Sequence, residues 1–174
     1  DNIERAYEAI RDVLVPANID FELVFVNDGS KDNSFERVRQ LAETVTDGKI
    51  LGLSFSRNFG KESAMLAGLE HASGEYVAIM DSDLQHSPDM LLEMYKKLIN
   101  NLEYDVVCAY KSSRKDEKPI KRTLTSLFYR FNNIISDVKL LPGASDFRVF
   151  KSSVKDVIIS LPEKTRFLKG IFSW

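Results

Sequence analysis

The sequence predicts an α/β fold in which a mostly parallel sheet carries helices on both faces. Over the first 110 residues, apolar residues with helical spacing alternate with short apolar runs typical of buried strands. Turns rich in Asp, Asn, Gly and Ser follow several of these runs. With 174 residues, of which 44% are hydrophobic, the chain can bury a core between such layers.

The predicted elements follow one another in regular order. Four stretches have helical periodicity, the second of them after Ser34 as its cap, and four others are strand-like. Ser87 and Pro88 are the expected cap and first residue of the fourth helix. The helices are expected over 3–14, 35–45, 64–69 and 90–99, and the strands over 21–26, 50–55, 76–80 and 104–110.

Charge is divided unevenly along the chain, although the net charge is only −2. Residues 1–110 hold 10 Lys and Arg against 20 Asp and Glu, whereas residues 111–174 hold 14 against 6. One interpretation is an acidic part that binds a metal and a basic part that meets phosphates or an anionic bilayer; the other is two solvated faces. No nucleic-acid partner is expected. The single cysteine, Cys108, lies in an apolar run and is expected in the core.

Two carboxylates stand where the strand 76–80 ends. Asp81 and Asp83 are one residue apart, and Gln85 adds a carbonyl oxygen two residues later. Ligands of an open parallel sheet bind at the carboxyl ends of its strands. Oxygen ligands crowded there are typical of a hard divalent cation, so we interpret this segment as a metal site. The alternative is an acidic loop in water.

Polar segments follow the two preceding strands. Asp28 lies in the turn after the strand 21–26, and it should reach the same edge of the sheet as Asp81. A second acidic group at that edge suggests a nucleotide ligand. Arg57 and Lys61 flank the start of a helix, where cations and free N–H groups favour an anion.

A basic amphipathic helix is predicted over residues 118–136, with apolar residues at helical spacing between Lys and Arg. It suits either a membrane interface or packing on the core of the domain itself. The candidates for contact with an acceptor phosphate or with lipid headgroups are Arg114, Lys115, Lys121 and Arg122.

Motifs along nearly the whole chain form a combination that is specific to one family. They read VNDGSKDNS, SRNFGKESAMLAGLEHASGEYV, MDSDLQHSPD, SSRKDEK with TSLFYRF, GASDFRVF and RFLKGIFSW. In this combination the chain resembles family-2 glycosyltransferases with the GT-A fold. Within that family it is similar to polyprenyl-phosphate sugar transferases of the dolichyl-phosphate mannose synthase and bactoprenol glucosyltransferase type.

The resemblance implies roles for several residues. Asp81, Asp83 and Gln85 would bind Mg²⁺ or Mn²⁺ together with the diphosphate of a nucleotide-sugar donor. Asp146, in the DFR segment, would be a catalytic base or a group that orients the acceptor. The residues assigned to the donor are Asp28, which would contact the nucleoside, with Arg57, Lys61, Asp81 and Ser82.

The implied reaction is a metal-dependent, inverting transfer of a hexose from a UDP- or GDP-sugar to a polyprenyl phosphate at the cytoplasmic face of a membrane. The alternative acceptor is a sugar hydroxyl in polysaccharide synthesis. A hydroxyl needs a base, whereas a phosphate is already ionised. With a lipid phosphate, Asp146 would mainly orient the acceptor, through Arg148 or a neighbouring cation. The sequence leaves the base, the hexose and self-association open.

The chain also departs from the family pattern. The first strand, with its Pro-x-Tyr-Asn-Glu type segment, and the membrane anchors of lipid-linked members are not found, so we expect 1–174 to be one catalytic domain shortened at both ends. Two alternatives belong to other classes. One is a phosphoacceptor receiver domain using Asp28, Asp81 and Lys111, and the other is a nucleotide-sugar binding module without catalysis.

Overall fold

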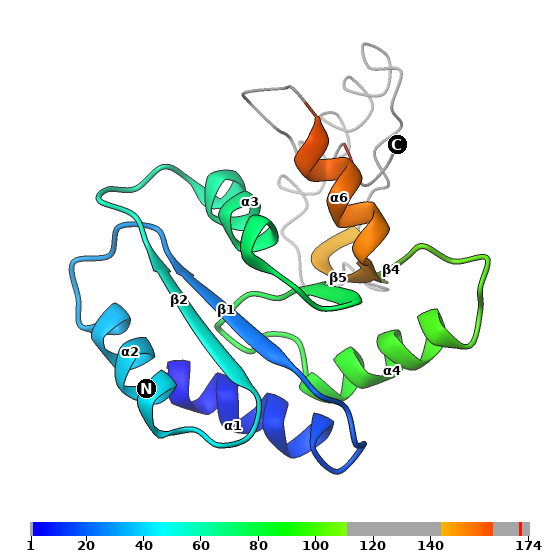
Figure 1. Cartoon of the computed structure of the whole chain (residues 1–174), viewed down its shortest axis with the longest axis horizontal. Coiled ribbons are helices and arrows are strands. Elements are labelled where there is room, and N and C mark those ends of the chain that lie inside the picture. The colour runs from blue at the N-terminus through cyan, green and yellow to red at the C-terminus, as the bar shows by residue number, and fades with distance from the viewer. Residues whose placement is uncertain (1, 111–143, 162–170, 172–174) are drawn as a thin grey trace, which may run out of the picture.

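The structure is a computed structural model that describes residues 2–110, 144–161 and 171. From residue 2 to residue 110 the helices and strands alternate along the chain, as Figure 1 shows. In order they are α1 (Asn2–Leu14), β1 (Glu22–Asn27), α2 (Ser34–Thr44), β2 (Lys49–Ser54), α3 (Lys61–His71), β3 (Tyr76–Ile79), α4 (Pro88–Ile99), β4 (Val106–Tyr110), β5 (Ala144–Lys151) and α6 (Ser152–Ser160).

Local sequence explains where the helices begin. Ser87 caps α4 by accepting a hydrogen bond from the N–H of Asp89, and Pro88 occupies the first helical position, as predicted. The prediction that Ser34 caps α2 is wrong, because Ser34 is already helical. Its N–H instead donates to the carboxylate of Asp32 at 3.1 Å.

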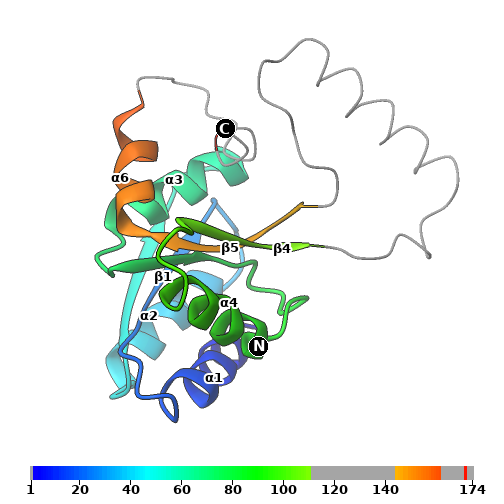
Figure 2. The same ribbon diagram turned by 90° about the vertical axis from the view of Figure 1, so that its right-hand side faces the viewer.

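The strands form two small sheets. β1 and β2 pair in parallel, with Asn27 opposite Ser54 at their carboxyl ends. In the other sheet, β5 lies between β3 and β4 and runs antiparallel to both. Figure 2 shows the strands as a middle layer, with α3 and α6 on one side and α1, α2 and α4 on the other.

The alternation of side chains along β5 joins the two halves of the core. Phe147 and Val149 pack with α1, α4 and β4, where Leu98 is also buried. Phe150 points the other way and packs with Leu69 of α3 and Ile158 of α6. Both phenylalanines are almost completely inaccessible to solvent. Asp146 and Arg148 share the Phe150 side of the strand by this alternation.

The α/β fold and the first eight elements are confirmed, but β5 was not predicted. The prediction that Cys108 lies in the core is wrong. Cys108 is exposed on β4 opposite Arg148, and the alternation of the strand buries Ala109 instead. The predicted helix 118–136 lies outside the described residues. Within the described part of the chain, no helix has the length and apolarity needed to cross a membrane.

Candidate functional site

The loops that follow β1 and β2 meet at the carboxyl edge of their sheet. The Asp28 carboxylate accepts hydrogen bonds from the N–H groups of Phe59 at 2.7 Å and Gly60 at 3.0 Å. Gly29 has φ +74°, and a Cβ there would lie 2.3 Å from the carbonyl carbon of Arg57. Only glycine permits this approach, which fixes the start of α3 against the turn after β1.

The carboxylates of the MDSDLQ segment follow β3. Asp81, Asp83 and Gln85 are all exposed. Asp83 accepts a hydrogen bond from the N–H of Gln85 at 3.1 Å, and Leu84 between them has φ +55°. A left-handed conformation is unfavourable for a leucine, and such conformations cluster at functional sites. Asp83 and Gln85 therefore lie in one local turn, with both side chains exposed.

Lys61 connects this loop to β5. Its Nζ lies 2.9 Å from Asp81 Oδ1 and 2.8 Å from Asp146 Oδ2. Asp146 can reach the first residue of α3 because it projects from the face of β5 that α3 and α6 cover. The exposed side-chain fractions are 49% for Lys61, 50% for Asp81 and 35% for Asp146. The three charges therefore form an accessible cluster at the open edge.

The environment shifts the pKa of Lys61. Burial by itself would lower the pKa of the ammonium, but the hydrogen bonds and charges of Asp146 and Asp81 outweigh burial and raise it. Lys61 therefore carries a positive charge at neutral pH.

Arg148 is buried beneath Asp146 and contacts the backbone beside it. It is 3% exposed, and it donates from Nε to the carbonyl of Asp146 at 3.1 Å and from an NH2 nitrogen to the carbonyl of Ser145 at 2.9 Å. Burial lowers the pKa of its guanidinium. By binding these two backbone carbonyls, the buried Arg148 holds the first residues of β5 in place, and with them Asp146.

Two residues that the sequence interpretation missed also join these segments. His86 Nε2 lies 2.9 Å from Ser145 Oγ, and the His86 ring stacks on Phe147 at 5.0 Å between centroids. His86 follows Gln85 directly, so a histidine beside the predicted metal ligands was the available signal. Ser145 gave no signal, because only the fold brings β5 to this loop.

The predicted metal ligands fit a cation that is shared with a phosphate ligand. Among the described residues, no three His, Cys, Asp or Glu side chains are arranged to hold a metal ion by themselves. Asp81 and Asp83 do offer accessible carboxylates on one open loop. Mg²⁺ is usually held by one or two carboxylates together with water and substrate phosphates, so this oxygen set suits Mg²⁺ or Mn²⁺, and the phosphates of a donor would add further ligands.

The structure thus brings together Asp28, Arg57, Lys61, Asp81 and Asp146. Arg57 is exposed and lies 4.9 Å from the centre of the Phe59 ring, next to the turn of Asp28. The roles assigned to these residues, and to Ser82, Asp83 and Gln85 on the same loop, stay predictions. Arg148 is placed but turned inward, and Arg114, Lys115, Lys121, Arg122 and Lys111 lie outside the described residues.

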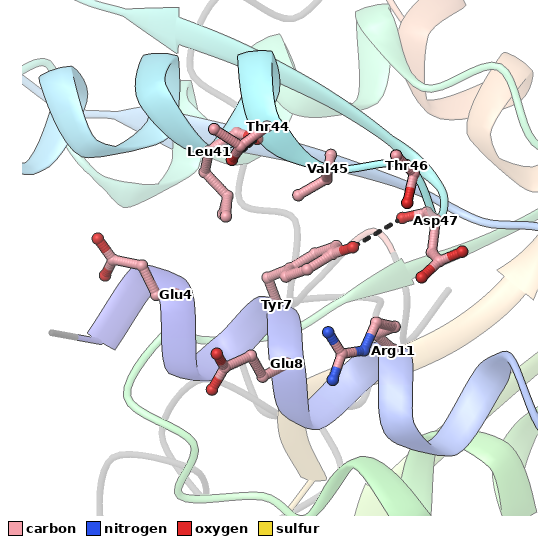
Figure 3. A pocket seen from close by; sticks show the side chains of 9 residues that line it. All are labelled: Glu4, Tyr7, Glu8, Arg11, Leu41, Thr44, Val45, Thr46 and Asp47. Atoms are coloured by element: carbon pink, nitrogen blue, oxygen red, sulfur yellow. Dashed lines mark hydrogen bonds between the residues drawn. The ribbon is translucent and has the colours of Figure 1, made fainter.

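A hollow of about 250 Å³ lies at the opposite edge of the sheet. Figure 3 shows it between α1 and the end of α2, where the Tyr7 hydroxyl donates to the carbonyl of Asp47 at 3.0 Å. Asp47 precedes β2, whereas Asp28 follows β1, and the two strands are parallel. The hollow is therefore separate from the carboxylate cluster.

The α/β layers and the acidic carboxyl edge are typical of a protein that binds a ligand at the ends of its strands. The model of the family "Glycosyl transferase family 2" matches residues 1–157, so the chain belongs to this family. The finding confirms the resemblance seen in the sequence, including the enzyme class. It removes support from the receiver-domain alternative.

Similar proteins agree with this assignment. A bactoprenol glucosyl transferase of Shigella phage SfV is 39% identical over 168 residues, which are 97% of this chain and 53% of that protein. An uncharacterized glycosyltransferase of Synechocystis is 37% identical over the whole chain and 54% of its own length. The chain thus spans about half the length of these relatives.

A solved structure shows the same fold. The mannosyltransferase PcManGT from Pyrobaculum calidifontis, in complex with GDP-Man and Mn²⁺, matches with a TM-score of 0.62 and 24% identity. The match covers 92% of this chain and 44% of that one. It confirms the GT-A type of α/β fold.

Proposed function

We propose that the protein transfers a hexose from a nucleotide diphosphate sugar to a polyprenyl phosphate, with inversion and with help from a divalent cation. The observation that carries this proposal is the meeting of Asp81 and Asp146 at Lys61. It brings the loop assigned to the donor next to the strand assigned to the acceptor. The similarity to a bactoprenol glucosyl transferase favours a polyprenyl phosphate as acceptor.

The donor would lie across the carboxyl edge. Asp28 and the start of α3 would face its nucleoside, while Asp81, Asp83 and Gln85 would hold Mg²⁺ or Mn²⁺ beside its diphosphate. A similar fold holds GDP-Man and Mn²⁺ in PcManGT. When bound, the cation would supply positive charge that stabilises the leaving diphosphate.

The residues of the chain would position the acceptor. In a single displacement, an acceptor oxygen bonds to the anomeric carbon as the bond to the diphosphate oxygen breaks, so no residue needs to form a covalent intermediate. Asp146, held in place by Arg148, would orient the phosphate through a neighbouring cation, from the opposite side of the sugar. A lipid acceptor requires work at a membrane, and the cytoplasmic face of that membrane is part of the same proposal.

A sugar hydroxyl is the second candidate acceptor, and the accessible carboxylate of Asp146 favours it. A hydroxyl must lose its proton as it attacks, and a carboxylate base typically accelerates this step by ~10²–10⁴-fold. A phosphate monoester with a second pKa near about 6 is mostly ionised at pH 7 and needs no base. The two acceptors therefore make different demands on Asp146.

The test is a transfer assay of the full-length protein with UDP- and GDP-sugars, offered either undecaprenyl phosphate or oligosaccharide acceptors. We expect transfer to the lipid phosphate, and Asp146→Asn should retain measurable turnover because the amide keeps the shape of the side chain. Loss of about 10²-fold or more would indicate a proton acceptor. Donor binding without transfer to any acceptor would contradict the proposal and favour a binding module.

A further inference from the structure

One lysine contacts two carboxylates to which different roles are assigned. Asp81 belongs to the loop proposed to bind the cation and the donor, and Asp146 belongs to the strand proposed to meet the acceptor. Lys61 Nζ contacts both, at 2.9 Å and 2.8 Å. An ammonium and a divalent cation both bind carboxylate oxygens, so they compete for Asp81.

We propose that Lys61 is a positioning residue whose ammonium takes the place of the divalent cation at Asp81. It holds Asp81 and Asp146 together while the donor site is empty, and it releases Asp81 when a divalent cation arrives. After release, its ammonium keeps Asp146 as a partner. The inference rests on the proposed function, because it requires Asp81 and Asp83 to bind the cation.

The geometry allows this exchange without movement of the backbone. Lys61 is the first residue of α3, and the start of that helix is held by the Asp28 carboxylate through the N–H groups of Phe59 and Gly60. The lysine side chain itself is half-exposed. Its flexible four-carbon stem lets the ammonium move while the helix stays in place. Ion pairs of such exposure are individually weak, so a divalent cation can displace one of them.

Electrostatics gives the sign of the effect. Without the ammonium, Asp81 loses its ion pair with Lys61, while Asp146 keeps the Arg148 guanidinium at 3.8 Å. The negative charge at Asp81 is then less neutralised, and a divalent cation binds there more favourably. Removal of Lys61 should therefore strengthen binding of the bare cation. If Lys61 only kept the carboxylates in place for the metal, its removal would weaken binding or leave it unchanged.

The experiment is a calorimetric titration of the full chain with Mn²⁺ in the absence of donor. We expect Lys61→Gln to bind Mn²⁺ about 2–5-fold more tightly than the unchanged chain, from the usual strength of exposed ion pairs. Lys61→Arg keeps the charge and should stay near the unchanged chain. The control Lys96→Gln removes an equal charge from an exposed position on α4 and should have no effect.

Equal or weaker Mn²⁺ binding by Lys61→Gln would overturn the inference. Misfolding cannot imitate the expected result, because a disrupted site would lose affinity. Asp83→Ala separates this inference from the proposed function. If Asp83→Ala binds Mn²⁺ as the unchanged chain does, the proposed metal site is wrong and the inference fails with it. If Asp83→Ala loses binding while Lys61→Gln shows no gain, the inference alone is wrong.

Discussion

Carboxylates at the same edge of the fold are held in two different ways. Asp28 binds two backbone N–H groups, at 2.7 Å and 3.0 Å, that can leave only if the loop moves. Asp81 and Asp146 bind the side chain of Lys61, which can move alone. The comparison indicates a fixed support at the end of β1 and an exchangeable cluster between β3 and β5.

The fixed support should be the more sensitive of the two to backbone changes. We expect Gly29→Ala to lower the free energy of unfolding by ~2–4 kcal/mol, because the new Cβ collides with Arg57 and φ is positive. Gly60 also has positive φ, +95°, but a Cβ there would meet no atom within 4 Å. Gly60→Ala should cost less, about 1–3 kcal/mol. Chemical denaturation measures both, and equal losses would contradict the close packing at Gly29.

Neutralising single carboxylates should have the next largest effect, and the loss of unfolding free energy should differ between the two regions. Asp28→Asn should cost about 1–2 kcal/mol of unfolding free energy, because an amide cannot replace two charge-assisted hydrogen bonds to backbone N–H groups. Asp81→Asn should change it by less than about 0.5 kcal/mol, since its ion pair is half-exposed. Thermal and urea unfolding of both variants test this difference. A larger loss for Asp81→Asn would show that the cluster is structural.

The smallest effect concerns Glu22, which repeats the chemistry of Asp28 at the opposite edge of the sheet. Its carboxylate accepts from Ser73 N–H at 2.6 Å and from Gly74 N–H at 3.1 Å. Burial alone would raise the pKa of Glu22, but these hydrogen bonds outweigh it and lower the pKa below its ordinary value of 4.5. The stabilisation is present above pH 4.5 and is lost as pH falls through the lowered pKa.

The Glu22→Gln variant tests this assignment. The unfolding free energy of the unchanged chain should fall more steeply below pH 4.5 than that of Glu22→Gln. Glu93→Gln, at an exposed position on α4, should keep the slope of the unchanged chain. Identical slopes for the unchanged chain and Glu22→Gln would show that the hydrogen bonds to Ser73 and Gly74 do not stabilise the ionised form.

Sequence periodicity predicted much of the fold because the first eight elements are local. Period-2 and helical patterns are set by neighbouring residues, and a capping pair such as Ser87 and Pro88 acts within one turn. β5 was not predicted, because its position between β3 and β4 depends on contacts that are distant in sequence. The same reason explains the wrong expectation for Cys108, whose side of β4 is decided by pairing with β5.

The candidate site divides in the same way. Asp28 and Asp81 could be placed at one edge from the rule that ligands bind at the carboxyl ends of strands. The contact of Lys61 with both Asp81 and Asp146 could not, because it joins residues that are 20 and 85 positions apart. Likewise, an arginine at position 148 suggests a phosphate ligand. The sequence could not show that its side chain binds carbonyls of its own strand instead.

The most direct test of the account is calorimetric binding of UDP-glucose and GDP-mannose with Mn²⁺ or with excess chelator. We expect one of the donors to bind only in the presence of Mn²⁺. Asp83→Ala should abolish this binding without changing thermal unfolding, because Asp83 is exposed and its hydrogen bond is local. Glu93→Gln serves as the matched loss of an exposed charge and should bind normally. Donor binding of unchanged strength in excess chelator, or in Asp83→Ala, would contradict the cation-dependent site at the end of β3.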